Sequence, residues 1–132
     1  MKKGYAYERE LLHKLWEIGF AAVRTPASGV MSYPCPDIIA GNGKTYLAIE
    51  VKMRKSLPIY ISKDKVESLR RFAEVFGAKP LIALKVKGLG WRFFTLDMLD
   101  ECGSNYRIDE NKFYRGLDFD ELRGLKQLRL SD

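Results

Sequence analysis

The dipeptide Asn42-Gly43 separates two segments with the composition of β-strands, residues 37–41 and 44–53. Asn-Gly between such segments is the strongest short-range signal for a β-hairpin, because a two-residue type I′ turn needs a positive φ at both central positions. With these two residues as the whole loop, Asp37 faces Ala48 across the strand pair. The hairpin fixes the middle of the chain, and its register decides which side chains share a face.

This register brings three charged side chains onto one face of the hairpin. Residues directly opposite each other in an antiparallel pair point to the same side, and side chains alternate along each strand. Glu50 and Lys52 therefore share the face of Asp37, with Glu50 a diagonal neighbour of Asp37 at roughly 7–8 Å between backbones. The opposite face is predicted to be core and carries Leu47, Ile49 and Val51. A slip of one residue in the turn would reverse these assignments.

Helices and further strands are predicted around the hairpin. Apolar residues at helical spacing predict a helix over residues 5–18, and a second amphipathic helix over residues 63–76 ends at Gly77. The apolar stripe of the first helix consists of Leu11, Leu12, Leu15 and Trp16. The other predicted elements are strands over residues 20–24, 81–86 and 91–95, a loop over 25–36 and a short helix over 118–125. This order predicts one α/β or α+β domain over residues 1–132, with a central mixed β-sheet flanked by helices.

The charge of the chain favours a polyanionic partner. Lys and Arg number 23 against 17 Asp and Glu, giving a net charge of +6, and the excess of positive charge lies mostly in the first half, because the segment after Leu96 mixes both signs. Such a balance fits nucleic-acid binding, although many basic domains bind none. No apolar run reaches the length of a membrane span and no signal-peptide core follows the N-terminus, so a cytoplasmic protein without a membrane partner is expected.

The cysteines and the histidine offer no competing chemistry. Cys35 and Cys102 lack a partner at zinc-like spacing and are predicted to be incidental thiols. His13 is the only histidine, and it falls toward the polar side of the first helix, where a solvated position is expected.

A third carboxylate suggests a metal site. On a helical wheel Glu8 lies in the middle of the apolar stripe of the first helix, whereas Glu10 and Glu17 lie on the opposite, solvated face. A carboxylate directed toward a core is costly unless it is paired or bound to a metal ion. Together with Asp37 and Glu50 it indicates a hard-cation site with oxygen ligands. The alternative is a solvated, salt-bridging face, which is the commoner case for an isolated Glu-x-Lys.

Magnesium at such a site would support hydrolysis of a phosphodiester. Bound by carboxylates, it polarises a phosphate oxygen and lowers the pKa of a bound water, and we expect Mn²⁺ to substitute. Lys52 would orient that water or neutralise charge on the phosphorus in the transition state.

Pro36-Asp37 followed by Glu50-Val51-Lys52 is the PD-(D/E)xK signature of the restriction-endonuclease-like nucleases. Together with residues 4–11, 19–24 and 26–29, this signature resembles the archaeal Holliday junction resolvases. The resemblance is dense over residues 4–55 and looser through the second predicted helix and residues 90–93. It carries little beyond about Leu96.

The resemblance implies a restriction-endonuclease-like nuclease fold in one nuclease domain. It also implies a homodimer that binds four-way junction DNA and cuts two opposed strands symmetrically with magnesium, in homologous recombination and repair, without an organic cofactor. The implied catalytic residues are Glu8, Ser28, Asp37, Glu50 and Lys52, and the implied metal ligands are Glu8, Asp37, Glu50 and the carbonyl of Val51. Arg9 and Arg24 would contact phosphate or support the site. The alternative for Ser28 is a turn residue in a loop rich in Pro and Gly.

Four further basic residues are candidates for contacts with the DNA backbone: Lys2, Lys3, Arg54 and Lys55. Phe72 and Phe76 lie one turn apart on the second predicted helix and are candidates for the dimer interface. Ordinary packing inside the domain is the alternative for both rings.

Three other functions remain open. Another repair or restriction-type nuclease of the same superfamily would share the catalytic residues, and a non-catalytic DNA-binding module would be expected to have lost at least one of them. An RNA-binding module would present aromatic platforms on a sheet. Core packing is the expected use of most of the candidate aromatics, which are Tyr46, Trp91, Phe93 and Phe94.

Overall fold

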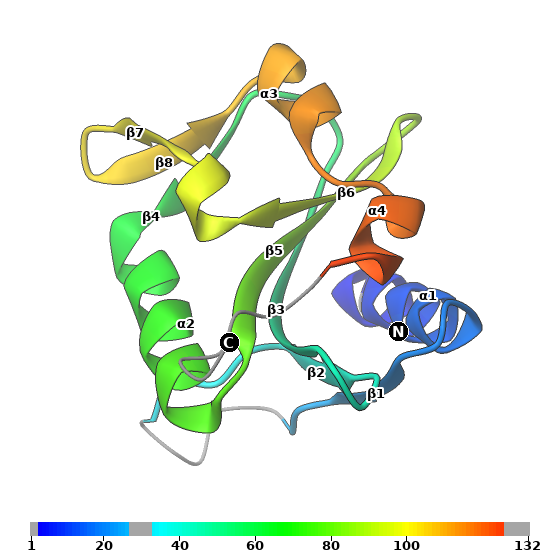
Figure 1. Cartoon of the computed structure of the whole chain (residues 1–132). Coiled ribbons are helices and arrows are strands. Elements are labelled where there is room, and N and C mark those ends of the chain that lie inside the picture. Colours follow the sequence, from blue (N-terminus) through cyan, green and yellow to red (C-terminus); the bar gives the residue numbers. More distant parts are fainter. Residues whose placement is uncertain (1–2, 27–32, 126–132) are drawn as a thin grey trace.

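The structure is a computed structural model that describes residues 3–26 and 33–125, and its centre is a five-stranded sheet in the order β1-β2-β3-β5-β6 (Figure 1). The strands are β1 (Ala21–Arg24), β2 (Ile38–Gly41), β3 (Tyr46–Arg54), β5 (Lys79–Val86) and β6 (Gly90–Thr95). β3 and β5 run parallel, and the other neighbours are antiparallel. The predicted central mixed sheet is confirmed.

Two helices cover the opposite faces of this sheet (Figure 1). On one face α1 (Lys3–Glu17) contributes Leu11 and Leu15 to a core shared with Leu47 and Ile49 of β3. On the other face α2 (Lys63–Phe76) packs its buried residues over Ala48. The sheet therefore separates two cores, one under each helix, and β3 contributes to both.

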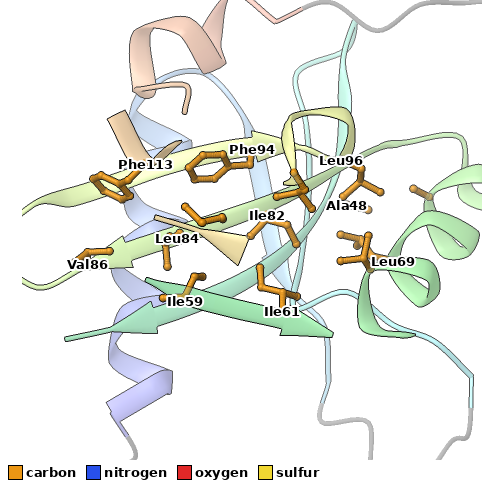
Figure 2. Close-up of a cluster of buried hydrophobic side chains, with 14 of the residues drawn as sticks. Ala48, Ile59, Ile61, Leu69, Ile82, Leu84, Val86, Phe94, Leu96 and Phe113 are labelled. Carbon is orange, nitrogen blue, oxygen red and sulfur yellow. The ribbon is translucent and has the colours of Figure 1, made fainter. Parts of the chain in front are cut away.

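α2 has the predicted boundaries because both of its ends are capped. The Ser62 side chain accepts a hydrogen bond from the Lys65 N–H at the start. Gly77 adopts the left-handed conformation at the end, with a φ of 88° that favours glycine. Val66, Leu69 and Ala73 are buried on the face toward the sheet, and Figure 2 shows Leu69 beside Ala48.

The hairpin between β2 and β3 forms, but the predicted two-residue turn is wrong. Gly41 pairs with Tyr46, and Ile38 pairs with Ile49, so the register is displaced by two residues from the prediction. Because side chains alternate with a period of two along a strand, an even displacement leaves every side chain on its predicted face. The displacement moves Asp37 from a position opposite Ala48 to the end of the strand pair, one residue beyond the pairing of Ile38 with Ile49.

The longer loop forms because Asn42 caps it from within. The Asn42 Oδ1 accepts hydrogen bonds from the N–H groups of Lys44 and Thr45, at 2.9 and 2.7 Å. Gly43 takes the one positive φ that this loop requires, at 88°. The buried Thr45 hydroxyl donates to the carbonyl of Leu125, which joins the loop to the C-terminal part of the described chain.

The elements that the sequence did not predict are short. A second sheet has the order β4-β8-β7, with β4 (Ile59–Ser62), β7 (Asp100–Cys102) and β8 (Asn105–Ile108). A 3₁₀ helix η2 (Leu96–Met98) and α3 (Glu110–Arg115) were also missed, whereas α4 (Phe119–Arg123) lies within the helix predicted over residues 118–125. Side chains from these elements extend the core on the α2 side: Ile59, Ile61, Leu96 and Phe113, which are labelled in Figure 2, and Ile108.

Two side chains of α1 depart from the predicted helical wheel. Glu10 was assigned to the solvated face, but its Oε1 accepts hydrogen bonds from the Lys85 ammonium at 2.5 Å and from the Trp91 indole at 2.6 Å. Trp16 was assigned to the apolar stripe, but it is 58% exposed and donates to the Ala22 carbonyl. The buried stripe of α1 is thus narrower than predicted. None of the helices in the described part of the chain combines the length and the hydropathy needed to cross a membrane.

Candidate active site

Asp37 and Glu50 meet where the β2–β3 ladder ends. The Asp37 N–H donates to the carbonyl of Ile49 at 2.9 Å, although Ile49 is already the partner of Ile38, so the regular pairing ends at Asp37. One carboxylate oxygen of Asp37 accepts a hydrogen bond from the N–H of Val51 at 2.8 Å. The backbone of β3 therefore holds the Asp37 side chain next to Glu50. The two carboxylates line the same cleft, as the shared face of the hairpin predicts.

The segment before Asp37 is held by Thr25. The Thr25 N–H donates to the Asp37 carbonyl at 3.0 Å, and its hydroxyl is hydrogen-bonded to the carbonyl of Pro36. Pro36 is itself buried. The backbone of Asp37 is thus hydrogen-bonded on one side to Thr25, directly after β1, and on the other side to Ile49 of β3.

Glu50 and Lys52 share the α2 side of β3, as the alternation of the strand requires. The Lys52 ammonium lies 3.6 Å from Glu50 Oε2, and only 15% and 16% of the two side chains are exposed. Burial, and after it the charge of Asp37, raises the pKa of Glu50 from 4.5 to about 7. Burial also lowers the pKa of Lys52, against the attraction of Glu50.

These electrostatics fit a divalent cation. Two carboxylates in a partly buried site repel each other, and both can stay ionised at neutral pH only with compensating positive charge. Oxygen ligands of this kind are those that Mg²⁺ prefers. Asp37 and Glu50 therefore form a donor pair of the right chemistry for a hard cation.

Glu8 lies beside this pair, and its own ion-pair partner is Arg24. The Arg24 Nε lies 3.6 Å from Glu8 Oε1, and the guanidinium stacks 3.4 Å from the centre of the Tyr5 ring. Burial first, and then the charge of Asp37, raises the pKa of Glu8. Within residues 3–26 and 33–125, no three His, Cys, Asp or Glu side chains are grouped closely enough to form a metal site. Glu8 is thus an electrostatic neighbour of Asp37, and its role as a metal ligand stays a prediction.

The structure separates the other predicted residues into several groups. Arg9 is exposed on α1, and Arg54 and Lys55 are exposed at the end of β3. Lys3 begins α1, but its side chain is outside what the structure describes, and Lys2 and Ser28 lie outside the described residues altogether. The backbone of Val51, including its carbonyl, lies in β3 directly after Glu50.

Phe72 and Phe76 differ in how deeply they are buried in the domain, and their place in a dimer interface stays a prediction. Their rings stack with centres 5.3 Å apart. Phe72 is half-buried against the core on the α2 side, whereas Phe76 is 52% exposed. Beside them Val75 is 92% exposed. One ring therefore supports the domain, and the other leaves an apolar surface on α2.

A cleft of about 650 Å³ connects the carboxylates to α2. Asp37 and Glu50 lie on one wall, and the other wall is formed by α2 residues that include Lys65, Ser68 and Arg71. Sequence reasoning assigned no role to this second wall. The available signal was the three-residue spacing of these polar side chains, which places them on one side of a helix.

A lysine beside paired carboxylates, at the open end of a hairpin within a mixed sheet, is the arrangement of the PD-(D/E)xK nucleases. Fold and site together define this class of protein. The sequence profile of the archaeal Holliday junction resolvases (Hjc) matches residues 1–130, and the chain belongs to this family.

Individual relatives agree with this assignment. The chain is 54% identical over 122 residues to the crossover junction endodeoxyribonuclease Hjc of Archaeoglobus fulgidus, covering 92% of this chain and 90% of the relative. It is 38% identical over 133 residues to Hjc of Methanocaldococcus jannaschii, covering 99% and 95%. The solved structure of A. fulgidus Hjc, described as a Holliday junction resolvase from an archaeal hyperthermophile, matches with a TM-score of 0.87 at 52% identity over 91% of this chain and 99% of that one.

Proposed function

We propose that this chain is a metal-dependent endonuclease that resolves four-way DNA junctions by paired symmetric nicks, in homologous recombination and repair. The observation that carries the proposal is the intact set of Asp37, Glu50 and Lys52 in a chain that matches the resolvase family over almost its full length. A module that had lost catalysis would be expected to lack at least one of these residues. With DNA as its substrate, we expect the protein to work in the cytoplasm.

The proposed metal site consists of Asp37 and Glu50, with Glu8 and the Val51 carbonyl as further ligands. When bound, Mg²⁺ or Mn²⁺ would polarise a phosphate oxygen and activate water. The protein's own contribution is to hold the carboxylates in place through the Val51 N–H and to keep Lys52 next to them. Lys52 would donate to the scissile phosphate, where negative charge develops. Ser28 is proposed as a further catalytic residue on the family resemblance alone.

The proposed DNA-binding residues are basic: Lys2, Lys3, Arg9, Arg24, Arg54 and Lys55. Each phosphate neutralised on duplex DNA contributes about −0.9 to the slope of log affinity against log salt. Junction affinity should therefore fall steeply with salt.

A homodimer is the proposed active form. A four-way junction presents two equivalent strands related by a two-fold axis, and a dimer with the same symmetry supplies two sites. The exposed Phe76 and Val75 offer apolar surface for such an interface. A heterodimer with one Asp37→Asn subunit should nick one strand and fail to resolve the junction in a single encounter. Coordinated double cutting by that heterodimer would contradict the two-site argument.

The decisive experiment compares matched four-way, three-way and duplex DNA in Mg²⁺, with each cut mapped to the nucleotide. We expect paired, symmetric cuts in the four-way junction alone. Asp37→Asn should bind the junction without cutting it, and Ca²⁺ should likewise support binding only. Equal cutting of plain duplex would identify a repair or restriction-type nuclease instead, and full activity in excess chelator would refute the metal site.

A further inference from the structure

The α2 wall of the active-site cleft presents a row of polar side chains to the catalytic carboxylates. Lys65, Ser68 and Arg71 recur every three residues along α2, and all three line the cleft together with Asp37 and Glu50. Six residues of α-helix correspond to a rise of about 9 Å, so Lys65 and Arg71 stand well apart along the wall. The row thus follows the cleft over a distance longer than one phosphate group.

The basic residues of α2 differ in their partners. Lys63 pairs with Glu101 at 2.6 Å and Arg70 pairs with Glu67 at 3.3 Å, and neither of these cations lines the cleft. Lys65 and Arg71 do line the cleft, and over residues 3–26 and 33–125 neither has a carboxylate within 4.0 Å of its charged nitrogens. The cations whose charge is not locally paired are thus those that face the reacting groups.

Lys65 also lies close to the catalytic lysine. The charge of Lys65 lowers the pKa of Lys52. The same charge opposes the rise of the Glu50 pKa that burial causes. Two ammonium groups so near each other repel, and an anion between them removes the repulsion. A phosphate oxygen is an anion of the appropriate size and charge, and the proposed substrate supplies it.

We propose that Lys65 and Arg71 form a phosphate-binding wall on α2 that holds the DNA strand against the catalytic carboxylates. The inference rests on the proposed junction-cutting function. Lys65 contacts the scissile phosphate or the one next to it, since it lies near Glu50 and Lys52. Arg71 lies farther along α2 and grips a neighbouring phosphate, for which its planar guanidinium is suited.

The test uses Lys65→Ala and Arg71→Ala in the full chain, with Arg70→Ala as the matched control. Arg70 is on the same helix, outside the cleft and paired with Glu67. Junction binding is measured in Ca²⁺ across a salt series, and single-turnover cleavage is measured in Mg²⁺ with enzyme in excess. Thermal melting of each variant reports whether it is folded.

Each wall residue has its own expected signature. Arg71→Ala should weaken junction binding in Ca²⁺ and flatten the salt slope by about 0.9. Lys65→Ala should flatten the slope by a similar amount and also slow the single-turnover rate by about 10-fold to 100-fold, less than the 10²–10³ expected for a charge that acts alone. Lys65→Arg, which keeps the charge, should restore the slope, and Arg70→Ala should match the wild type in both readouts.

The proposal is overturned if folded Lys65→Ala and Arg71→Ala keep the wild-type salt slope and cleavage rate. A loss of melting temperature with no change in slope would also overturn it, since the residues would then be structural. Junction cleavage by the wild type tests the proposed function separately from the phosphate-binding wall. If the wild type fails to cut junctions, the proposed function is wrong, whereas a flattened slope in the variants would still support the phosphate-binding wall.

Discussion

Glu50→Gln should stabilise the metal-free protein at pH 8 although it abolishes cleavage. Burial raises the pKa of Glu50 from 4.5 to about 7, so the folded protein binds this proton more tightly than the unfolded chain does. The contribution of Glu50 to the free energy of unfolding is fully present below about pH 4.5 and is lost as the pH rises through 7. Glutamine keeps the shape of the side chain and cannot ionise, so the variant should escape the loss.

The size of the effect follows from the two pKa values. The gap of roughly 2.5 between 4.5 and about 7, multiplied by about 1.4 kcal/mol for each whole step, gives an upper limit of about 3.5 kcal/mol. The attraction of Lys52 at 3.6 Å is already contained in this limit, because it lowers the pKa of Glu50. Relaxation of the protein around the buried charge reduces the gain. We therefore expect Glu50→Gln to exceed the wild type by about 1–2 kcal/mol at pH 8, as the remainder of that limit.

The assay is urea unfolding in chelator at pH 5 and pH 8. The difference between Glu50→Gln and the wild type should appear at pH 8 and shrink at pH 5, where the wild-type carboxyl is protonated. Asp37→Asn should show the same sign, because the charge of Asp37 is the second cause of the raised pKa. Glu67→Gln, an exposed carboxylate paired with Arg70, is the control and should not gain stability. If Glu50→Gln were less stable than the wild type at both pH values, the buried-charge argument would fail.

Three further predictions test other parts of the molecule. Lys52→Ala should slow single-turnover cleavage by about 10²–10³, with junction binding in Ca²⁺ retained, and an unchanged rate would remove Lys52 from the catalytic site. Glu10→Gln should lower the melting temperature at neutral pH, because the hydrogen bond from Lys85 lowers the pKa of Glu10 below 4.5. This stability is present above pH 4.5 and is lost as the pH falls through the lowered pKa, so the effect of the variant should fade only in stronger acid; an equal loss at neutral and strongly acidic pH would contradict this. Phe76→Lys should have the mass of one chain in light scattering. Tyr114→Lys is the control, because Tyr114 is also 52% exposed, and it should leave the dimer intact. A dimeric Phe76→Lys would place the interface elsewhere.

The sequence predicted which face of the hairpin carries Asp37, Glu50 and Lys52, even though it predicted the wrong turn. The physical reason is parity: the observed register differs by two residues, and a displacement of two preserves the face of Asp37, Glu50 and Lys52. The Asn42 side chain, which accepts hydrogen bonds from two backbone N–H groups of the loop, selects the longer connection. Local sequence signals were thus sufficient for the orientation of side chains and insufficient for the exact pairing.

The parts that the sequence did not predict depend on distant partners. Glu10 reads as a solvated residue on an isolated helix, and only the packing of α1 against β5 and β6 brings it to Lys85 and Trp91. The second sheet has strands too short for a clear alternation, and β4 pairs with β8, which lies more than forty residues later. Patterns within a single segment carry no information about such contacts.

The cleft wall is the most informative of these cases, because one prediction would have been enough to find it. β3 and β5 are parallel neighbours, and parallel strands require a crossover connection, usually a helix. α2 lies in that connection and packs on the face of β3 that carries Ala48, which is also the face of Glu50 and Lys52. A parallel pairing of β3 with β5 therefore implies that one side of α2 overlooks the catalytic residues. The polar side chains next to its apolar stripe must then line the cleft, and Lys65 and Arg71 are the basic residues at those positions.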